Sequence, residues 1–484
     1  MQNSKLIDLL SKLSSKDLTK FSDYVHSPYF NKHKEVTQLC EELVYTAPKF
    51  DHPRRLNSAY LYAKIYPQQT YNNRKFNHLS SQLLQLLYDF LAVQRCQQES
   101  AQKQLWLLEE LRKYRAEKHY PYASKRHYKI LEQSEDQKAQ QYFYQYHFHK
   151  EQNAKFIDEG GRQYNAHLQE GNNALDLFFV LEKLQVACDM ASRNIVIQSN
   201  YEWTMLDTVL DYVEQSEYAK YPILQAYKAI FKLLTSKPAE NERYYQQLKQ
   251  LLEAHRTEFS RKDLMGLYDH ALNYAIKQIN QGAIEYYAEA LDHYIFLVES
   301  QLIFMDGYLL GWDYKNIVTI ALRQKKYDWT AQFIEEYQHY LPPDIKETGY
   351  YYNLASLYYA KADYGAALEC LHNVEFKDAS YYIGAKIIQL KSYYELDAGE
   401  ALYSLLEAFN SYLRRHQNVS TYRMQANANL IKLTKKLYRL KSDKGILSKK
   451  KYKVAYDKFQ QRLATLSPIA NKDWLEGEIF KLKI

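Results

Sequence analysis

The segment from Gly311 to His416 repeats itself, and this periodicity constrains the fold more than any other feature of the chain. In the first copy the recurring positions are Tyr314, Ile317, Val318, Tyr327 and Ile334. In the second copy, 37 residues later, they are Tyr351, Leu354, Ala355, Tyr364 and Leu371. In a third copy, 34 residues further on, Leu354, Ala367, Leu368, Leu371 and Val374 are matched by Ile388, Ala401, Leu402, Leu405 and Ala408. Periods of about 20 to 50 residues indicate stacked units that bury a continuous core between neighbours.

Apolar residues elsewhere in the chain also follow helical spacing. One helical face is formed by Phe76, Leu79, Leu83, Leu87 and Phe90. Another is formed by Ala174, Leu177, Leu181, Leu184, Cys188, Ala191 and Ile195. Steps of three and four residues place these side chains on one side of a helix. Because no segment alternates apolar and polar residues with a period of two, we predict an all-α fold.

Several short signals predict where helices begin and end. Ser14 with Asp17, and Ser260 with Asp263, have the spacing of a capping box. Prolines predicted to end helices are Pro28, Pro48, Pro53 and Pro67, while Pro222 and Pro238 bracket another helix. Turns are predicted at Gly160-Gly161 and at Gly171-Asn172-Asn173, before the helix that starts at Ala174.

The chain has 49 tyrosines but only 13 glycines and 10 prolines. A tyrosine has a large apolar ring and a polar tip, so it suits positions that are half-buried between neighbouring helices. The composition therefore favours long helices that pack against one another through aromatic side chains.

The repeated segment resembles the tetratricopeptide repeat, a 34-residue pair of helices. The matching residues of the middle copy are Tyr351, Leu354, Ala355, Tyr358, Tyr364, Ala367 and Leu371. The third copy departs from the pattern at Gln389 and Ser392, and a weaker copy surrounds Tyr274, Ala275, Gly282, Leu291 and Tyr294. The resemblance implies a right-handed superhelical array of antiparallel helix pairs, an α-solenoid.

We expect four regions along the chain. They are an N-terminal helical module (1–95), a central array of degenerate repeats (96–310), the tetratricopeptide-like repeats (311–416) and basic capping helices (417–484).

Composition limits the class of protein. Hydrophobic residues make up 46% and charged residues 25% of the chain, as in globular proteins. The sequence has no signal-peptide pattern and no run of about 18 uncharged apolar residues, so we expect a protein without a transmembrane segment. Its four cysteines are scattered, which is typical of a reducing, cytoplasmic environment.

In the resembling family, the first helix of each pair lines a concave surface that binds a peptide. The corresponding candidates here are Trp312, Lys315, Asn316, Thr319, Tyr352, Asn353, Ser356, Tyr359 and Lys386. The side-chain amides of Asn316 and Asn353, which lie one repeat apart, are suited to hold a peptide backbone, and the two lysines are suited to attract a carboxylate. The alternative is that these residues are ordinary polar surface.

The sequence predicts no enzyme, no cofactor and no metal site. His147 and His149 point about 200° apart on a helix, so they cannot share an ion, and no third ligand of suitable spacing follows them. No phosphate-binding loop follows a strand, and none of the cysteines has a cationic flank that marks it persuasively as a reactive nucleophile.

The C-terminal end carries the chain's positive charge. From Ile431 to Ile484 there are 15 Lys and Arg against 5 acidic residues, although the whole chain has a net charge of only +7. The cluster consists of Lys435, Lys436, Arg439, Lys441, Lys444, Lys449, Lys450, Lys451 and Lys453. Three interpretations remain open: a solvated cap on the helical array, a nucleic-acid site, or a site for an acidic protein or membrane surface.

Two functions follow from these observations. The first is a non-catalytic intracellular scaffold or adaptor that binds a protein or peptide partner on its concave face. The alternative is a regulatory protein that contacts nucleic acid through its Lys-rich end.

Overall fold

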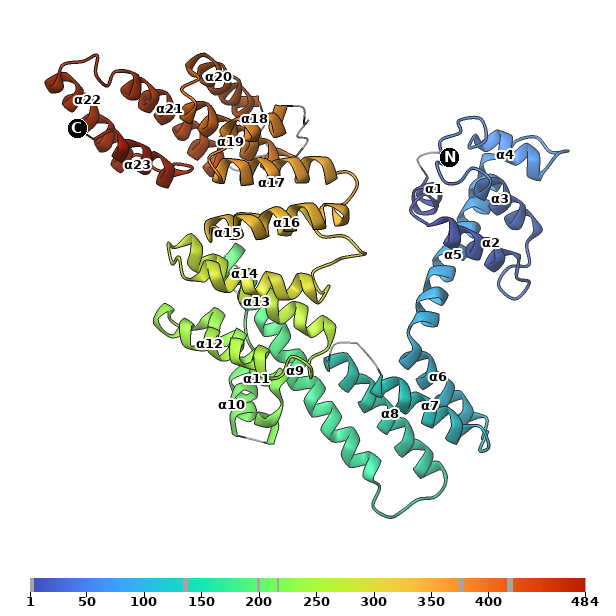
Figure 1. Ribbon diagram of the computed structural model, residues 1–484. Coiled ribbons are helices and arrows are strands. Elements are labelled where there is room, and N and C mark those ends of the chain that lie inside the picture. Colours follow the sequence, from blue (N-terminus) through green and yellow to red (C-terminus); the bar gives the residue numbers. More distant parts are fainter. Residues whose placement is uncertain are drawn as a thin grey trace. The chain divides into compact units, whose positions relative to one another are not determined.

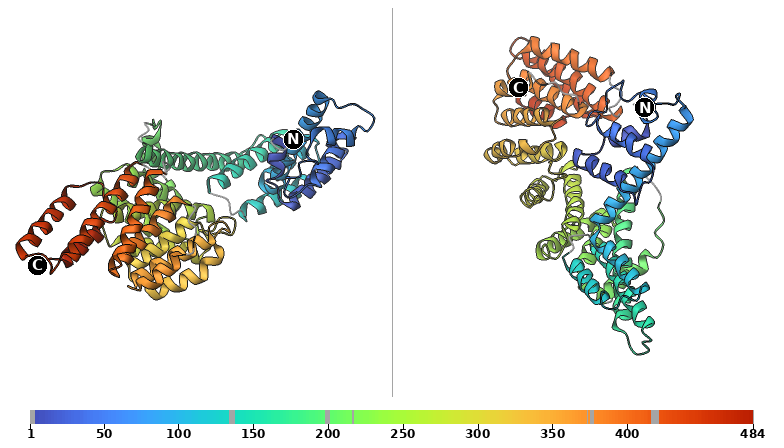
Figure 2. Two further views of the ribbon diagram at one scale, coloured as in Figure 1. Left: turned by 90° about the horizontal axis from the view of Figure 1, so that it is seen from above. Right: turned by 90° about the vertical axis from the view of Figure 1, so that its right-hand side faces the viewer.

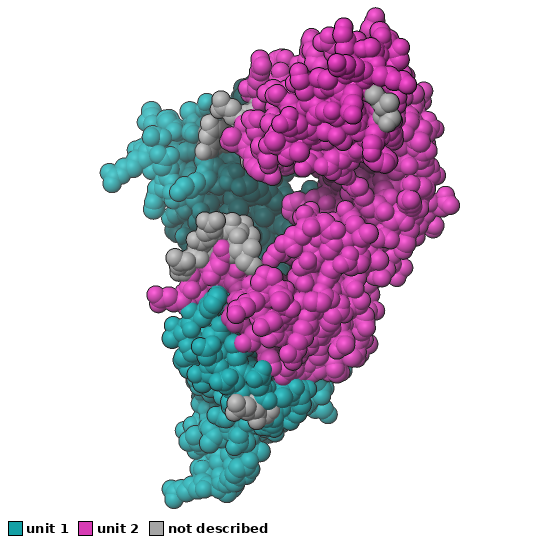
Figure 3. Space-filling view, turned by 90° about the vertical axis from the view of Figure 1, so that its left-hand side faces the viewer, with its two compact units in different colours: residues 1–187, 203–220 teal, residues 188–202, 221–484 magenta. Residues whose placement is uncertain are grey.

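The computed structural model describes residues 4–133, 138–197, 201–215, 217–372, 374, 378–415 and 421–483. Over these residues the chain is all-helical, as predicted, with 23 α-helices, two 3₁₀ helices and a single isolated β-bridge between Met305 and Tyr308 (Figure 1). It divides into two compact units (Figure 3). Unit 1 comprises residues 1–187 and 203–220, and unit 2 comprises residues 188–202 and 221–484.

Unit 1 begins with five helices around one hydrophobic core. These are α1 (Lys5–Leu10), α2 (Ser15–His26), α3 (Lys34–Val44), α4 (Ser58–Ile65) and α5 (Asn73–Gln98). The four predicted prolines all lie between them, and the predicted apolar face of α5 is buried in this core. Ser14 caps α2 by accepting a hydrogen bond from the backbone N–H of Asp17 at 3.1 Å.

The rest of unit 1 continues the chain of helices. These are α6 (Ser100–Lys113), α7 (Tyr120–Glu132), α8 (Lys138–Asp158), the first part of α9 (Ala166–Ile197), α10 (Leu206–Gln215) and η1 (Glu217–Lys220). The predicted turn at Gly160-Gly161 joins α8 to α9, and Gly160 has a φ of 80° that favours glycine.

The predicted turn at Gly171 is wrong, because α9 starts earlier, at Ala166, and runs through Gly171. A single glycine inside a helix costs only about 1 kcal/mol relative to alanine, and packing outweighs that cost. The apolar face from Ala174 to Ala191 is buried as predicted, whereas the side chain of Ile195 lies outside the described residues.

Unit 2 contains the remaining helices. The first group is α11 (Pro222–Thr235), α12 (Pro238–Ala254), α13 (Arg261–Asn280), α14 (Tyr286–Glu299), α15 (Gly311–Arg323) and α16 (Tyr327–Tyr337), followed by η2 (Gln338–Tyr340). The second group is α17 (Lys346–Ala360), α18 (Tyr364–His372), α19 (Ala379–Glu395), α20 (Gly399–Arg415), α21 (Thr421–Ser442), α22 (Lys449–Thr465) and α23 (Lys472–Lys481).

Each helix of unit 2 packs against the next helix in the chain from α11 to α23, and α15 to α20 follow one another through the unit in chain order (Figures 1 and 2). The three predicted repeat copies correspond to the packed pairs α15/α16, α17/α18 and α19/α20. In the middle pair, Ala355 and Ala367 are completely buried. The end of the third copy, at His416, lies outside the described residues.

The helices α13, α15, α17 and α19 all end in the same way. The N–H of Ala283, Lys326, Asp363 and Ala398 each donates to the carbonyl five residues before it, at 2.9–3.1 Å. The preceding residue has a positive φ in every case: 100° at Gly282, 55° at Lys325, 62° at Ala362 and 56° at Asp397. This is the Schellman motif, which satisfies the last carbonyls of a helix while the chain reverses.

Hydrogen bonds from tyrosine hydroxyls connect these helices. Tyr314 donates to the carbonyl of Ile334, and Tyr381 donates to the carbonyl of Gly311, both at 2.8 Å. At the C-terminal end, Tyr438 and Tyr452 donate to the carbonyls of Asp397 and Leu482. A buried phenol needs such a partner, and here the partner is a carbonyl on another segment.

Candidate functional site

A groove of about 680 Å³ lies in unit 2 beside the first helices of the three repeat copies. Its walls come from α15, α17 and α19, and it is completed by Arg423 of α21 and by the residues around the start of α23. The first helices therefore line one surface, and segments that are distant in the sequence close its end.

Five of the nine predicted groove residues line this cavity. They are Lys315, Thr319, Tyr352, Ser356 and Tyr359. The structure does not bring Trp312, Asn316, Asn353 or Lys386 to it. The Asn316 amide donates instead to the hydroxyl of Tyr294 at 3.4 Å, and Lys386 donates to Gln389 at 3.0 Å.

The proposed role of Asn353 needs correction. Its side chain is completely buried, and its amide donates to the carbonyl of Gly349 in the preceding turn of α17 at 2.8 Å. A residue in this position cannot reach the backbone of a peptide outside the protein. The Asn316–Asn353 pair is therefore not part of the groove.

Lys315 is half-buried against two aromatic rings. Its ammonium lies 4.7 Å from the ring centroid of Tyr352 and 5.2 Å from that of Tyr381, and it donates to the hydroxyl of Ser380 at 3.5 Å. Burial, followed by the charge of Arg423, lowers the pKa of Lys315. Within the described residues, no carboxylate lies within 4.0 Å of this ammonium.

Lys391 provides a second cation with a similar environment. Its ammonium donates to the side-chain oxygen of Asn471 at 2.6 Å and lies near the rings of Tyr359 and Trp474. Burial lowers the pKa of Lys391 to about 8. In the part of the chain that the structure describes, Lys391 also has no ion-pair partner, whereas its neighbour Asp473 pairs with Arg323 at 3.3 Å.

Gly384 allows the aromatic wall of the groove to form. A Cβ atom at this position of α19 would lie 2.6 Å from the hydroxyl of Tyr352. The absence of a side chain at Gly384 therefore lets Tyr352 of α17 pack directly on α19.

Sequence reasoning missed Lys391, Arg423, Asn471 and Trp474. The missing signal is spatial, because these residues come from the third copy and from two later helices that fold back beside it. The third copy departs from the repeat pattern at Gln389 and Ser392, which lie two residues before and one residue after Lys391, and this departure is a hint in the sequence.

The Lys-rich end combines a buried face with an exposed one. Leu433, Leu437, Leu440 and Tyr452 belong to a hydrophobic core shared by α19 to α23. All nine basic residues of the cluster except Lys441 are exposed. Lys441 is held by the carboxylate of Asp397 at 2.9 Å and by the carbonyl of Tyr394 at 3.0 Å. The apolar side chains of Ile446 and Val454 in the same segment face the solvent.

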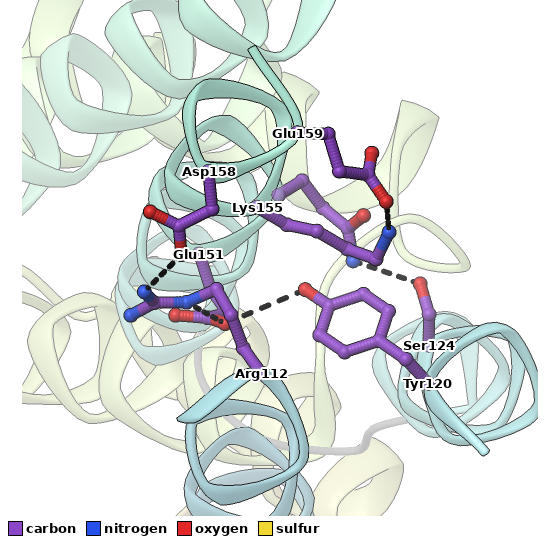
Figure 4. Close-up of polar contacts among 8 residues, drawn as sticks. Arg112, Tyr120, Ser124, Glu151, Lys155, Asp158 and Glu159 are labelled. Atoms are coloured by element: carbon purple, nitrogen blue, oxygen red, sulfur yellow. Dashed lines mark hydrogen bonds and ion pairs between the residues drawn. The ribbon is translucent and has the colours of Figure 1, made fainter. Parts of the chain in front are cut away.

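Unit 1 contains a separate polar network at the crossing of α6, α7 and α8 (Figure 4). The buried carboxylate of Glu151 accepts from Arg112 at 2.8 Å and from the hydroxyl of Tyr120 at 3.5 Å. Asp158 accepts from the same guanidinium at 2.8 Å, and Lys155 pairs with Glu159. Because the charges partner one another, this network holds three helices together.

A second polar cluster in unit 1 contains His149. The sequence shows no ligand near it, but α9 returns beside α8 and places His167 and Glu170 next to His149. The Nδ1 atom of His149 lies 2.9 Å from Nδ1 of His167 and 3.1 Å from a carboxylate oxygen of Glu170. The i, i+3 spacing of His167 and Glu170 is the signal that sequence reasoning overlooked. His147, which was considered with His149, is not part of the cluster.

Comparisons with known proteins assign no class to this chain. No protein-family model matches the sequence, and a comparison with curated proteins finds no match. Among the described helices, none is both long enough and apolar enough to cross a lipid bilayer.

Proposed function

We propose that this protein is a non-catalytic intracellular scaffold or adaptor whose groove in unit 2 binds an extended, acidic peptide segment of a partner protein. The two lysines of the groove carry this proposal. Each ammonium is half-buried beside aromatic rings and has no carboxylate partner among the described residues. Placing a cation in such a site is unfavourable unless an anion compensates for the lost hydration.

The helical order supports a solenoid of tetratricopeptide-like repeats as the framework of this function. The pairs α13/α14 to α19/α20 pack in sequence, and the first helix of each pair ends in a Schellman motif. The first helices of successive pairs also pack on one another, α15 on α17 and α17 on α19, and solenoids use such a row of helices as an extended binding surface.

One feature of the groove favours acidic over neutral peptides, and a second favours the binding of peptides in general. A peptide carboxylate that reaches Lys315 or Lys391 forms a charge-assisted hydrogen bond, which contributes about 1.5–3 kcal/mol. The rings of Tyr359 and Trp474 lie beside Lys391 and offer apolar contact for the rest of the peptide.

The test measures fluorescence anisotropy of labelled peptide pools with the full-length protein. One pool contains random extended peptides rich in Asp and Glu, and the second replaces those residues by Asn and Gln. We expect the acidic pool to bind at least about 10-fold more tightly, since one charged hydrogen bond accounts for that factor, and we expect binding to weaken as salt is added.

Variants locate the binding surface. The double substitution Lys315→Met and Lys391→Met removes both cations while retaining their apolar length, and it should abolish the preference for the acidic pool. The control is Lys361→Met, which removes an exposed lysine directly after α17 that lies outside the groove. Equal binding of both pools by the wild type, or unchanged binding by a folded double variant, contradicts the proposal.

A nucleic-acid contact through the Lys-rich end is the second candidate, because Lys449, Lys450, Lys451 and Lys453 are exposed and have no carboxylate within 4.0 Å in the described chain. Changing these four residues to Gln should remove retention on single-stranded DNA, whose backbone carries the phosphates. Retention that persists in this variant, or that does not fall with salt, rejects the nucleic-acid candidate.

A further inference from the structure

The cluster of His149, His167 and Glu170 has the dimensions of a metal-binding site. Its three ligand atoms are separated by 2.9, 3.1 and 3.6 Å. Zn²⁺ binds imidazole nitrogen and carboxylate oxygen at about 2.0–2.1 Å in tetrahedral geometry, which places ligand atoms about 3.3 Å apart. The three atoms therefore already occupy one triangular face of such a tetrahedron.

Neighbouring contacts hold the cluster in place. The amide of Asn165 donates to the side-chain oxygen of Asn153 at 2.9 Å, which joins the start of α9 to α8. The side-chain oxygen of Asn165 accepts from the backbone N–H of His167 at 3.2 Å. These two hydrogen bonds fix His167 opposite His149 without using either imidazole ring. A site that is positioned in this way loses little conformational freedom when it binds an ion.

The cluster is also accessible to a metal ion from the solvent, and its ligand types suit a transition metal. The side chain of His149 is 14% exposed, whereas those of His167 and Glu170 are 40% and 54% exposed. An ion can therefore enter from the solvent side, and a water molecule can complete its coordination. Two imidazoles and one carboxylate are borderline ligands that suit Zn²⁺ and related transition metals better than Ca²⁺ or Mg²⁺, which prefer oxygen ligands.

We propose that His149, His167 and Glu170 bind one Zn²⁺ ion and that the ion clamps α9 to α8. The ion would join residues on both sides of the α8–α9 turn. Binding to the folded state alone raises the stability of that state, as any ligand does.

Zinc binding is measured by isothermal titration of the full-length protein after treatment with a chelator. We expect one ion to bind per chain in the wild type. Combined substitution of His167→Gln and Glu170→Gln should weaken this binding by at least about 100-fold, since changes beyond the ligand shell already cost about 10- to 100-fold. Both side chains are substantially exposed, so this variant should remain folded, which circular dichroism checks.

Three further measurements separate this site from weak binding to other histidines, of which the chain has 15 in all. His147→Gln is the control, because His147 lies on the same helix but outside the cluster, and it should bind zinc like the wild type. Co²⁺ should give the intense visible absorption of a tetrahedral complex in the wild type and in this control only. Zinc should raise the thermal unfolding midpoint in the same two proteins. No binding by the wild type, or equal binding by the double variant, overturns the proposal.

Discussion

Lys391 shows how burial changes the chemistry of a single residue. Its ammonium loses hydration between Tyr359 and Trp474, and its pKa falls to about 8 from the 10.5 of an exposed lysine. The unfolded chain therefore binds more protons at this residue than the folded chain between about pH 8 and 10. The contribution of Lys391 to the free energy of unfolding therefore rises with pH over that interval.

This shift predicts two pH effects. Between about pH 8 and 10, the unfolding free energy of the wild type should rise relative to that of Lys391→Met, which urea titrations at several pH values measure. Over the same interval the acidic peptide pool should bind more weakly, because Lys391 loses its charge. A difference between the two proteins that stays constant with pH would show that Lys391 titrates as an exposed lysine does.

Glu151 gives a second prediction for a single residue. Its carboxylate is buried against Arg112 and Tyr120, so Glu151→Gln leaves the guanidinium with less compensating charge. We expect a loss of about 2–3 kcal/mol, somewhat less than for a fully buried ion pair because Arg112 is partly exposed. The control Glu110→Gln removes an exposed pair with Lys113 and should cost less than about 0.5 kcal/mol. Equal shifts in urea unfolding would contradict this prediction.

Among the elements, the two helix starts marked by a capping box were predicted accurately from the sequence. Ser14 and Ser260 both cap helices as their spacing indicates, because a cap depends only on residues within one turn. The predicted turn at Gly171 is wrong for the opposite reason, since glycine alone does not end a helix that is held by packing. Burial of Asn353 was also missed, because the repeat pattern gives a residue's position on its helix but not the depth of its neighbours.

The two capping boxes provide a matched pair for experiment. Ser14 caps an exposed helix start, whereas Ser260 is buried and bonds to the completely buried Asp263 at 2.7 Å. We expect Ser14→Ala to cost about 1 kcal/mol and Ser260→Ala about 2 kcal/mol, as lost caps do. Hydrogen exchange of the first turns of α2 and α13 measures both. A larger effect at Ser14 would contradict the role assigned to burial.

For the molecule as a whole, the all-helical fold and the paired helices of residues 311–415 were predictable, because each depends on periodicity within the chain. The composition of the groove was predictable only in part. Lys315, Tyr352 and Tyr359 follow from the repeat register, but Asn471 and Trp474 reach the groove only because α23 packs beside α21. No local pattern contains that information.

The last two helices should therefore be needed for the folded state of unit 2. Removal of residues 449–484 would uncover the core that contains Leu437, Phe409 and Leu430, and it would open the end of the groove. We expect this truncated chain to aggregate and to bind the dye ANS, whereas the variant with Lys449, Lys450, Lys451 and Lys453 changed to Gln should stay monodisperse in size-exclusion chromatography. A truncated chain that remains soluble and cooperative would contradict the role of α22 and α23 as a cap.

Trp474 gives the groove an optical reporter of its own. The chain has five tryptophans, and the indole of Trp474 lies 5.6 Å from the ammonium of Lys391 and 5.3 Å from the ring of Tyr394. Excitation of nearby tyrosines should transfer energy to this indole. The wavelength and intensity of its emission should respond to the polarity of a ligand bound beside it in the groove. Occupancy can thus be followed in the unlabelled protein, and subtracting the emission of the Trp474→Phe variant removes the contribution of the other four tryptophans.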